Sequence, residues 1–70
     1  MTTKEFYNML INQDGFCADT IRDRLSMDME DFAEDERYEY KITYNQWVST
    51  MKKALKWYEA KGEDYVTPTA

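Results

Sequence analysis

Histidine is absent from the 70-residue chain, which also contains only one cysteine, one proline and two glycines. Without histidine and with a single thiol, the chain lacks the ligands of most transition-metal sites and the base of Ser/His and Cys/His nucleophiles. The one cysteine, Cys17, excludes a disulfide within the chain and favours a reducing, cytoplasmic location. Gly15 and Gly62 lie too far apart to form a glycine-rich phosphate loop.

Acidic residues are the remaining inventory for catalysis, since the chain holds 14 of them against 9 basic residues, for a net charge of −5. A general acid–base pair also needs a cleft, which a helical domain of this size rarely provides. A calcium loop beginning at Asn12 fails because Phe16 and Cys17 occupy a ligand position and the turn glycine position. We therefore expect no enzyme activity, no metal site and no cofactor. Cys17 is predicted to be a packing residue, with acidic neighbours that raise the pKa of its thiol.

Long hydrophobic runs are also missing. The longest strongly apolar run in the first thirty residues is Met9-Leu10-Ile11, so the sequence predicts neither a signal peptide nor a membrane-spanning segment. Hydrophobic residues nevertheless make up 43% of the chain and aromatic residues 16%, which is typical of a folded domain rather than of a disordered acidic chain. We expect a single small helical domain over residues 1–62 and a flexible C-terminal tail over residues 63–70.

Three helices are predicted in the first part of the chain. Thr2 and Glu5 have the form of a capping box, and the apolar repeat that follows predicts a helix over residues 3–13, ended by Asp14-Gly15. A short second helix and a third helix that begins near residues 26–28 are indicated by two further apolar stripes: Cys17, Ala18, Ile21 and Leu25 in the second, and Met29, Phe32 and Ala33 in the third.

The last helix, over about residues 44–61, has the strongest signal. Thr43 and Gln46 give it a second capping box, apolar residues repeat every three or four positions, and Gly62 is placed to end it. Before this helix, apolar and polar residues alternate over residues 37–44, which is typical of a short strand or extended segment near residues 38–42. The expected fold is all-α, a compact domain of three or four helices packed around the long C-terminal helix.

Negative charge is concentrated in one part of the chain. Residues 28–39 contain seven acidic residues and one basic residue, a net charge of −6, whereas residues 41–70 carry +2. As a helix with a rise of about 1.5 Å per residue, this segment would carry roughly one net charge per 3 Å, close to the spacing of about 3.4 Å along one DNA strand. Such a run often only solvates a surface, but like charges four positions apart destabilise a helix and mixed charges give solubility without that cost.

The sequence therefore predicts a small acidic protein that binds another protein with a basic surface. One form is a virus- or phage-encoded inhibitor that occupies the nucleic-acid-binding groove of its target, whereas direct binding of nucleic acid by this chain is not expected. The tyrosines beside the acids are residue types enriched at interface hot spots. The predicted partner-binding residues are Asp28, Glu30, Asp31, Glu34, Asp35, Glu36, Tyr38, Glu39 and Tyr40.

Two other functions remain open from the sequence. The first is a self-associating structural or regulatory module, a homodimer that pairs strands through Tyr38, Tyr40 and Ile42. The second is a divergent helix-turn-helix-like domain with Lys52, Lys53 and Lys56 as its basic patch, although these lysines also suit a solvated helix face. Trp57 lies beside the apolar stripe of the last helix, where it either covers the edge of the domain or anchors a partner.

Overall fold

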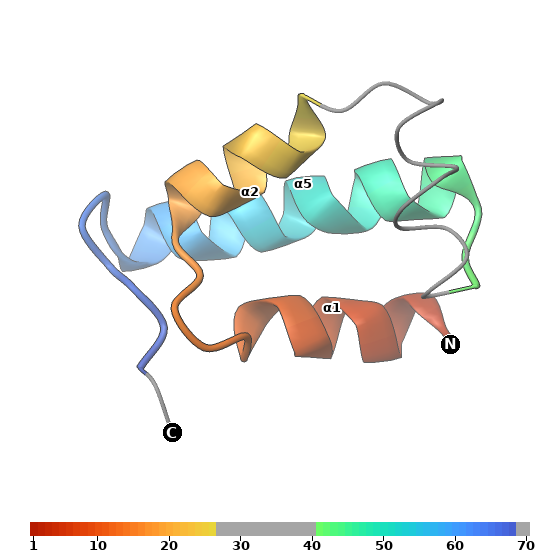
Figure 1. Ribbon diagram of the computed structural model, residues 1–70, viewed down its shortest axis with the longest axis horizontal. Helices are drawn as coiled ribbons and strands as arrows, with labels where there is room; N and C mark the ends of the chain where they lie inside the picture. The colour runs from red at the N-terminus through yellow and green to blue at the C-terminus, as the bar shows by residue number, and fades with distance from the viewer. Residues whose placement is uncertain (27–40, 69–70) are drawn as a thin grey trace.

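The computed structural model describes residues 1–26 and 41–68, and these residues contain three helices (Figure 1). Helix α1 spans Thr3–Ile11, α2 spans Ala18–Leu25 and α5 spans Tyr44–Lys61. The all-α fold and the long C-terminal helix are therefore confirmed. The third predicted helix, from near residues 26–28, lies outside the described residues except for its first position, and the strand-like residues 37–40 lie wholly outside them.

Capping boxes begin both α1 and α5. The Thr2 hydroxyl accepts a hydrogen bond from the Glu5 N–H at 3.1 Å, and the Glu5 carboxylate accepts one from the Thr2 N–H at 2.9 Å. Thr43 and Gln46 make the same exchange at the start of α5. At the other end of α5, Gly62 has a φ of 123°, a conformation that L side chains rarely adopt. The predicted signals therefore act where the sequence places them.

Helix α1 ends at Ile11 rather than at residue 13, because Asn12 leaves the helical conformation with a φ of −112° and a ψ of 5°. The Asn12 side-chain amide donates a hydrogen bond to the Asn8 carbonyl at 2.7 Å, which satisfies one of the free carbonyls at the helix end. Gly15, with a φ of 76°, then turns the chain toward α2.

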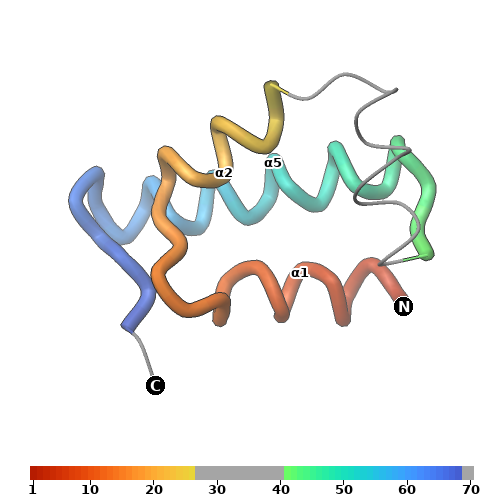
Figure 2. Tube along the Cα trace, viewed as in Figure 1, coloured from red at the N-terminus to blue at the C-terminus, as the bar shows by residue number. Residues whose placement is uncertain are grey.

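Both shorter helices pack against α5 (Figure 1). The trace shows that α1 and α5 run in the same direction, whereas α2 runs opposite to both (Figure 2). The core is one cluster of buried residues from α1, α2 and α5, together with Ile42, which precedes α5. Its members are Phe6, Leu10, Ala18, Ile21, Ile42, Trp47, Met51, Ala54 and Tyr58. The buried positions of α5 follow the predicted spacing of three and four. Across residues 1–26 and 41–68, no helix has both the length and the apolar character needed to cross a membrane.

At the junction before α5, apolar and polar residues alternate over residues 41–44, yet these residues do not form a strand. Lys41 has a φ of 54°, whereas a strand requires a strongly negative φ. Ile42 is only 5% exposed and packs in the core, Thr43 caps α5, and Tyr44 already belongs to the helix. The apolar residues of this stretch are therefore buried by the start of a helix and not by a sheet.

The residues after α5 fold back onto the loop between α1 and α2. The Gly15 N–H donates to the Thr67 carbonyl at 3.0 Å, and the Thr67 N–H donates to the Phe16 carbonyl at 2.8 Å. Cys17 and Val66 form a single antiparallel β-bridge at the same place. Residues 65–67, which we name the C-terminal strap, are thus packed where the sequence predicts a flexible tail.

A buried tyrosine hydroxyl joins the C-terminal strap to α1. The Tyr58 side chain is fully buried, and its hydroxyl donates to the Leu10 carbonyl at 2.7 Å. The Thr67 hydroxyl lies 2.8 Å from the Tyr58 oxygen and 3.2 Å from the Phe16 carbonyl oxygen. Burial raises the pKa of Tyr58, so its hydroxyl stays protonated and able to donate at neutral pH.

Replacement of Tyr58 by phenylalanine tests this link. Tyr58→Phe removes the hydrogen bond to the Leu10 carbonyl and the one shared with the Thr67 hydroxyl, and we expect the free energy of unfolding to fall by about 1–2 kcal/mol in urea denaturation at neutral pH. Tyr65→Phe is the matched control, because Tyr65 is half-buried and its hydroxyl forms no hydrogen bond to a described residue. Its effect should stay within about 0.5 kcal/mol.

The stability difference between the wild-type protein and Tyr58→Phe should also depend on pH in the alkaline range. Because the pKa of Tyr58 is raised in the folded state, its contribution to stability is complete below the ordinary tyrosine pKa of 10.0 and is lost as the pH rises through the folded-state pKa. The difference in the free energy of unfolding between wild type and Tyr58→Phe should therefore become smaller as the pH rises through the folded-state pKa. A constant difference into strong alkali would contradict a buried hydroxyl that donates to Leu10.

Candidate functional site

The predicted partner-binding residues all belong to the segment between α2 and α5. None of them is among the described residues, which stop at Ser26 and resume at Lys41: Asp28, Glu30, Asp31, Glu34, Asp35, Glu36, Tyr38, Glu39 and Tyr40. The binding surface therefore stays a prediction. The structure describes only the residues on either side of the segment that would form it.

Both flanks are held by the described fold. On the α2 side, Ser26 caps the helix and its hydroxyl donates to the Asp23 carbonyl at 2.5 Å. On the α5 side, Ile42 is buried in the core and Thr43 forms the capping box. Residues 27–40 thus begin and end at positions fixed by capping and packing.

The described residues are close to neutral. They contain eight basic and seven acidic residues, a net charge of +1, whereas residues 27–40 carry −6. The net negative charge of the chain therefore comes from the segment between α2 and α5, since the described residues have a slightly positive net charge.

The three lysines of the predicted basic patch, Lys52, Lys53 and Lys56, are exposed on α5. None of them forms an ion pair with a residue in the described part of the chain. Helix α5 has no acidic residue before Glu59, and the Glu59 carboxylate pairs with Arg22 of α2.

Trp57 covers one end of the core. Its ring meets the ring of Tyr58 edge-on, with centroids 5.0 Å apart, and that of Tyr65 at 5.9 Å. The Lys61 ammonium lies 5.0 Å from the centroid of the Trp57 ring, within the range of a cation–π contact. Of the two roles expected for Trp57, these contacts favour a cover for the edge of the domain.

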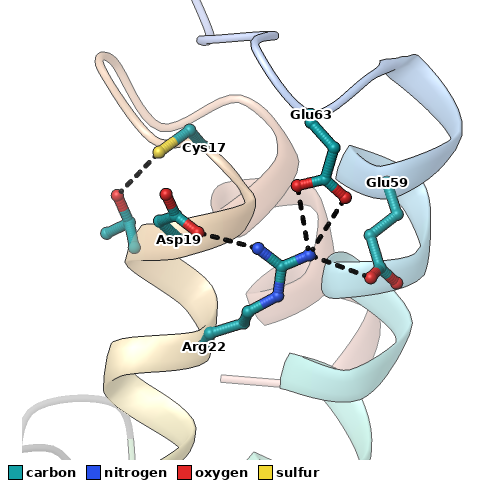
Figure 3. A network of polar contacts seen from close by, with 6 residues as sticks. Cys17, Asp19, Arg22, Glu59 and Glu63 are labelled. Atoms are coloured by element: carbon teal, nitrogen blue, oxygen red, sulfur yellow. Dashed lines mark hydrogen bonds and ion pairs between the residues drawn. The ribbon is translucent and has the colours of Figure 1, made fainter.

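Arg22 forms three ion pairs with residues in the described part of the chain (Figure 3). Its guanidinium donates to Asp19 at 2.7 Å within α2, to Glu59 of α5 at 3.0 Å and to Glu63 beyond α5 at 3.3 Å. The hydrogen bonds to Glu59, Glu63 and Asp19, in that order of size, raise the pKa of Arg22 above its ordinary value. Three carboxylates on one cation join α2 to the end of α5.

Sequence reasoning gives no sign of this ion-pair network. Glu59 and Glu63 lie 37 and 41 positions after Arg22, so they come within reach only after α2 packs against α5. Only the Asp19–Arg22 pair has helical spacing, and a pair of that kind is common on exposed helices.

Removal of the guanidinium should weaken the α2–α5 contact modestly, because the Arg22 side chain is 38% exposed and its pairs are partly screened. For Arg22→Met we expect a small decrease in the urea concentration at the unfolding midpoint at low salt, as for other exposed ion pairs. The loss should shrink at high salt. Lys56→Met, which removes an exposed cation without a described ion-pair partner, is the control and should change stability little. Equal effects of the two substitutions would show that only net charge matters.

Cys17 is the N-cap of α2 and is half-buried. Its thiol lies 3.4 Å from the Thr20 hydroxyl (Figure 3). The side-chain hydrogen bond to Thr20, followed by the backbone N–H of that residue, lowers the pKa of the thiol, and the opposing charge of Asp19 is the smallest contribution. The sequence-based expectation of a raised pKa is therefore wrong, because donors at the start of the helix outweigh acidic neighbours.

The thiol can report on this hydrogen bond. Thr20→Val removes the hydroxyl, and the pKa of Cys17 should rise, seen as a shift to higher pH in the rate profile of alkylation by iodoacetamide. Thr20→Ser keeps the hydroxyl and should preserve the wild-type profile. An unchanged profile in Thr20→Val would assign the lowered pKa to the helix backbone alone.

Comparison of the chain with protein-family models, with curated proteins and with solved structures finds no match in any of the three.

Proposed function

We propose that this chain is a small protein-binding domain whose acidic segment, residues 28–39, occupies a basic surface on another protein. The observation that carries the proposal is the separation of charge, +1 on the described residues against −6 on residues 27–40. A surface that serves solubility alone needs only interspersed charges of both signs. A single concentrated block is what electrostatic recognition of one basic surface requires.

Charge would act first in such a complex. Clustered charge of one sign steers a partner of opposite sign and raises the rate of association. Tyr38 and Tyr40 adjoin the acids in the sequence and offer aromatic area that is buried after the encounter. Because its flanks at Ser26 and Ile42 are held by the fold, the segment loses less conformational entropy on binding than a free peptide of the same length.

The concrete form of the proposal is occupancy of a nucleic-acid-binding groove, which would inhibit the target by competition, as a virus- or phage-encoded inhibitor does. The segment suits this role because its linear charge density in helical form, roughly one per 3 Å, is close to that of one DNA strand. The described residues, with a net charge of only +1, contribute too little positive charge to bind nucleic acid.

Burial of Ile42 weakens the self-associating alternative. Ile42 is one of the three residues expected to pair strands across a dimer, yet it is 5% exposed within a single chain and belongs to the core. Lys41, with a φ of 54°, interrupts the extended conformation that strand pairing would need at the same place.

Charge reversal in the segment tests the proposal. The tagged wild-type chain captures its partner from its own cell, the partner is identified by mass spectrometry, and its affinity is then measured with purified proteins. The substitution Asp31→Lys/Glu34→Lys/Asp35→Lys should weaken binding by more than about tenfold, as expected when several charge-assisted contacts are lost. Wild-type affinity should also fall steeply from low to physiological salt, and duplex DNA should compete with the chain.

A control with the same change in net charge separates the acidic segment from overall charge. Asp14→Lys/Asp23→Lys/Asp64→Lys reverses three exposed acids that have no ion pair in the described part of the chain. This variant should retain most of the affinity, and circular dichroism should show that both variants are folded. Equal weakening in the two variants, or full binding by the first, would overturn the proposal.

A further inference from the structure

A groove between α1 and α5 has a volume of about 260 Å³. It is lined by Thr3, Lys4 and Tyr7 from α1 and by Thr50 and Lys53 from α5. These residues follow helical spacing in both helices, so each helix contributes one continuous face. The volume lies just below the roughly 300 Å³ at which ordinary ligand pockets begin, which suits a small ligand.

The described lining of this groove, which we name the lysine groove, contains hydrogen-bond donors and no carboxylate. Two ammonium groups come from Lys4 and Lys53 and two hydroxyls from Thr3 and Tyr7, whereas the Thr50 hydroxyl already donates its one proton within α5. Thr50 is buried and its hydroxyl donates to the Gln46 carbonyl at 2.6 Å, so its oxygen stays in a fixed position. A ligand that is rich in acceptors would match this lining.

The two cations of the lysine groove differ from Arg22 in having no acidic partner. Neither Lys4 nor Lys53 forms an ion pair with any described residue, whereas Arg22 binds three carboxylates. The one acid of α1, Glu5, accepts a hydrogen bond from the Thr2 backbone and does not line the groove. Among the residues that the structure describes, no carboxylate pairs with either positive charge.

The position of Lys4 adds to this electrostatic picture. Lys4 lies in the first turn of α1, where the positive end of the helix dipole disfavours a cation by about 0.3–1 kcal/mol. Helix stability thus gives no reason for a lysine at this position. Binding of an anion does, because the charge of the side chain and the dipole of the helix then act on the ligand in the same sense.

We propose that the lysine groove binds the phosphate group of a small phosphate monoester. A phosphate offers several acceptor oxygens at one point, which fits ammonium groups from two helices and the neighbouring hydroxyls of α1. The ester group would occupy the remaining length of the groove beside Tyr7. None of these lining residues belongs to the acidic segment, and phosphate binding goes beyond the protein-binding function proposed above.

Amide chemical shifts in two-dimensional NMR provide the test, with inorganic phosphate and glycerol 3-phosphate as probes at constant ionic strength. We expect saturable shifts at Thr3, Lys4, Thr50 and Lys53, and tighter binding of the ester than of inorganic phosphate. Sodium chloride at the same ionic strength should give no saturable shift at these residues.

Lysine substitutions then locate the site. Lys4→Gln and Lys53→Gln should each weaken glycerol 3-phosphate binding by about tenfold, as loss of one charge-assisted hydrogen bond implies. Lys52→Gln removes an equal charge from the adjacent position of α5, outside the groove lining, and should change the affinity by less than about twofold. Absence of saturable shifts, or equal weakening by Lys52→Gln and Lys53→Gln, would overturn the proposal. Tighter binding of inorganic phosphate than of the ester would assign the groove to the free ion.

Discussion

One face of α5 is buried against both other helices, and the rest of the structure depends on that burial. Trp47, Met51, Ala54 and Tyr58 are at most 1% exposed, and each large apolar side chain among them contributes about 1.5–3 kcal/mol on removal from water. Helices of nine and eight residues, the lengths of α1 and α2, are marginal on their own in water. They persist because α5 gives each of them a surface to cover, and Ile42 fixes where that surface begins.

Local signals in the sequence predicted the helices well, since capping boxes and apolar spacing act over three or four residues. Thr2, Thr43 and Gly62 each perform the predicted role. Features made by distant residues were not predictable in this way. The Arg22 pairs with Glu59 and Glu63 and the Thr67–Phe16 bond join positions 37, 41 and 51 residues apart. Residues 63–70 were therefore predicted to be a flexible tail, although residues 65–67 pack against the α1–α2 loop.

The two candidate binding surfaces differ in the same way, because one is made of consecutive residues and the other of residues far apart in the sequence. The acidic segment could be found from the sequence, because charge density is a local property of consecutive residues, and its residues lie outside the described part of the chain. The lysine groove could not be found, because the residues that line it from α1 and from α5 are more than forty positions apart. Lys52, Lys53 and Lys56 were predicted as one patch, and of these only Lys53 lines the groove. Its partner cation, Lys4, carried no signal of its own.

The bond between Tyr58 and Leu10 also constrains how the chain acquires its structure during synthesis. It spans 48 residues, and Thr67 adds a further contact at the same point. Helix α1 leaves the ribosome before α5, yet the surface that it covers belongs to α5. Its apolar face must therefore wait, without its native contacts to α5, until α5 has emerged. Folding of this core is thus delayed until synthesis has passed α5, even though the capping boxes of α1 and α5 are local signals.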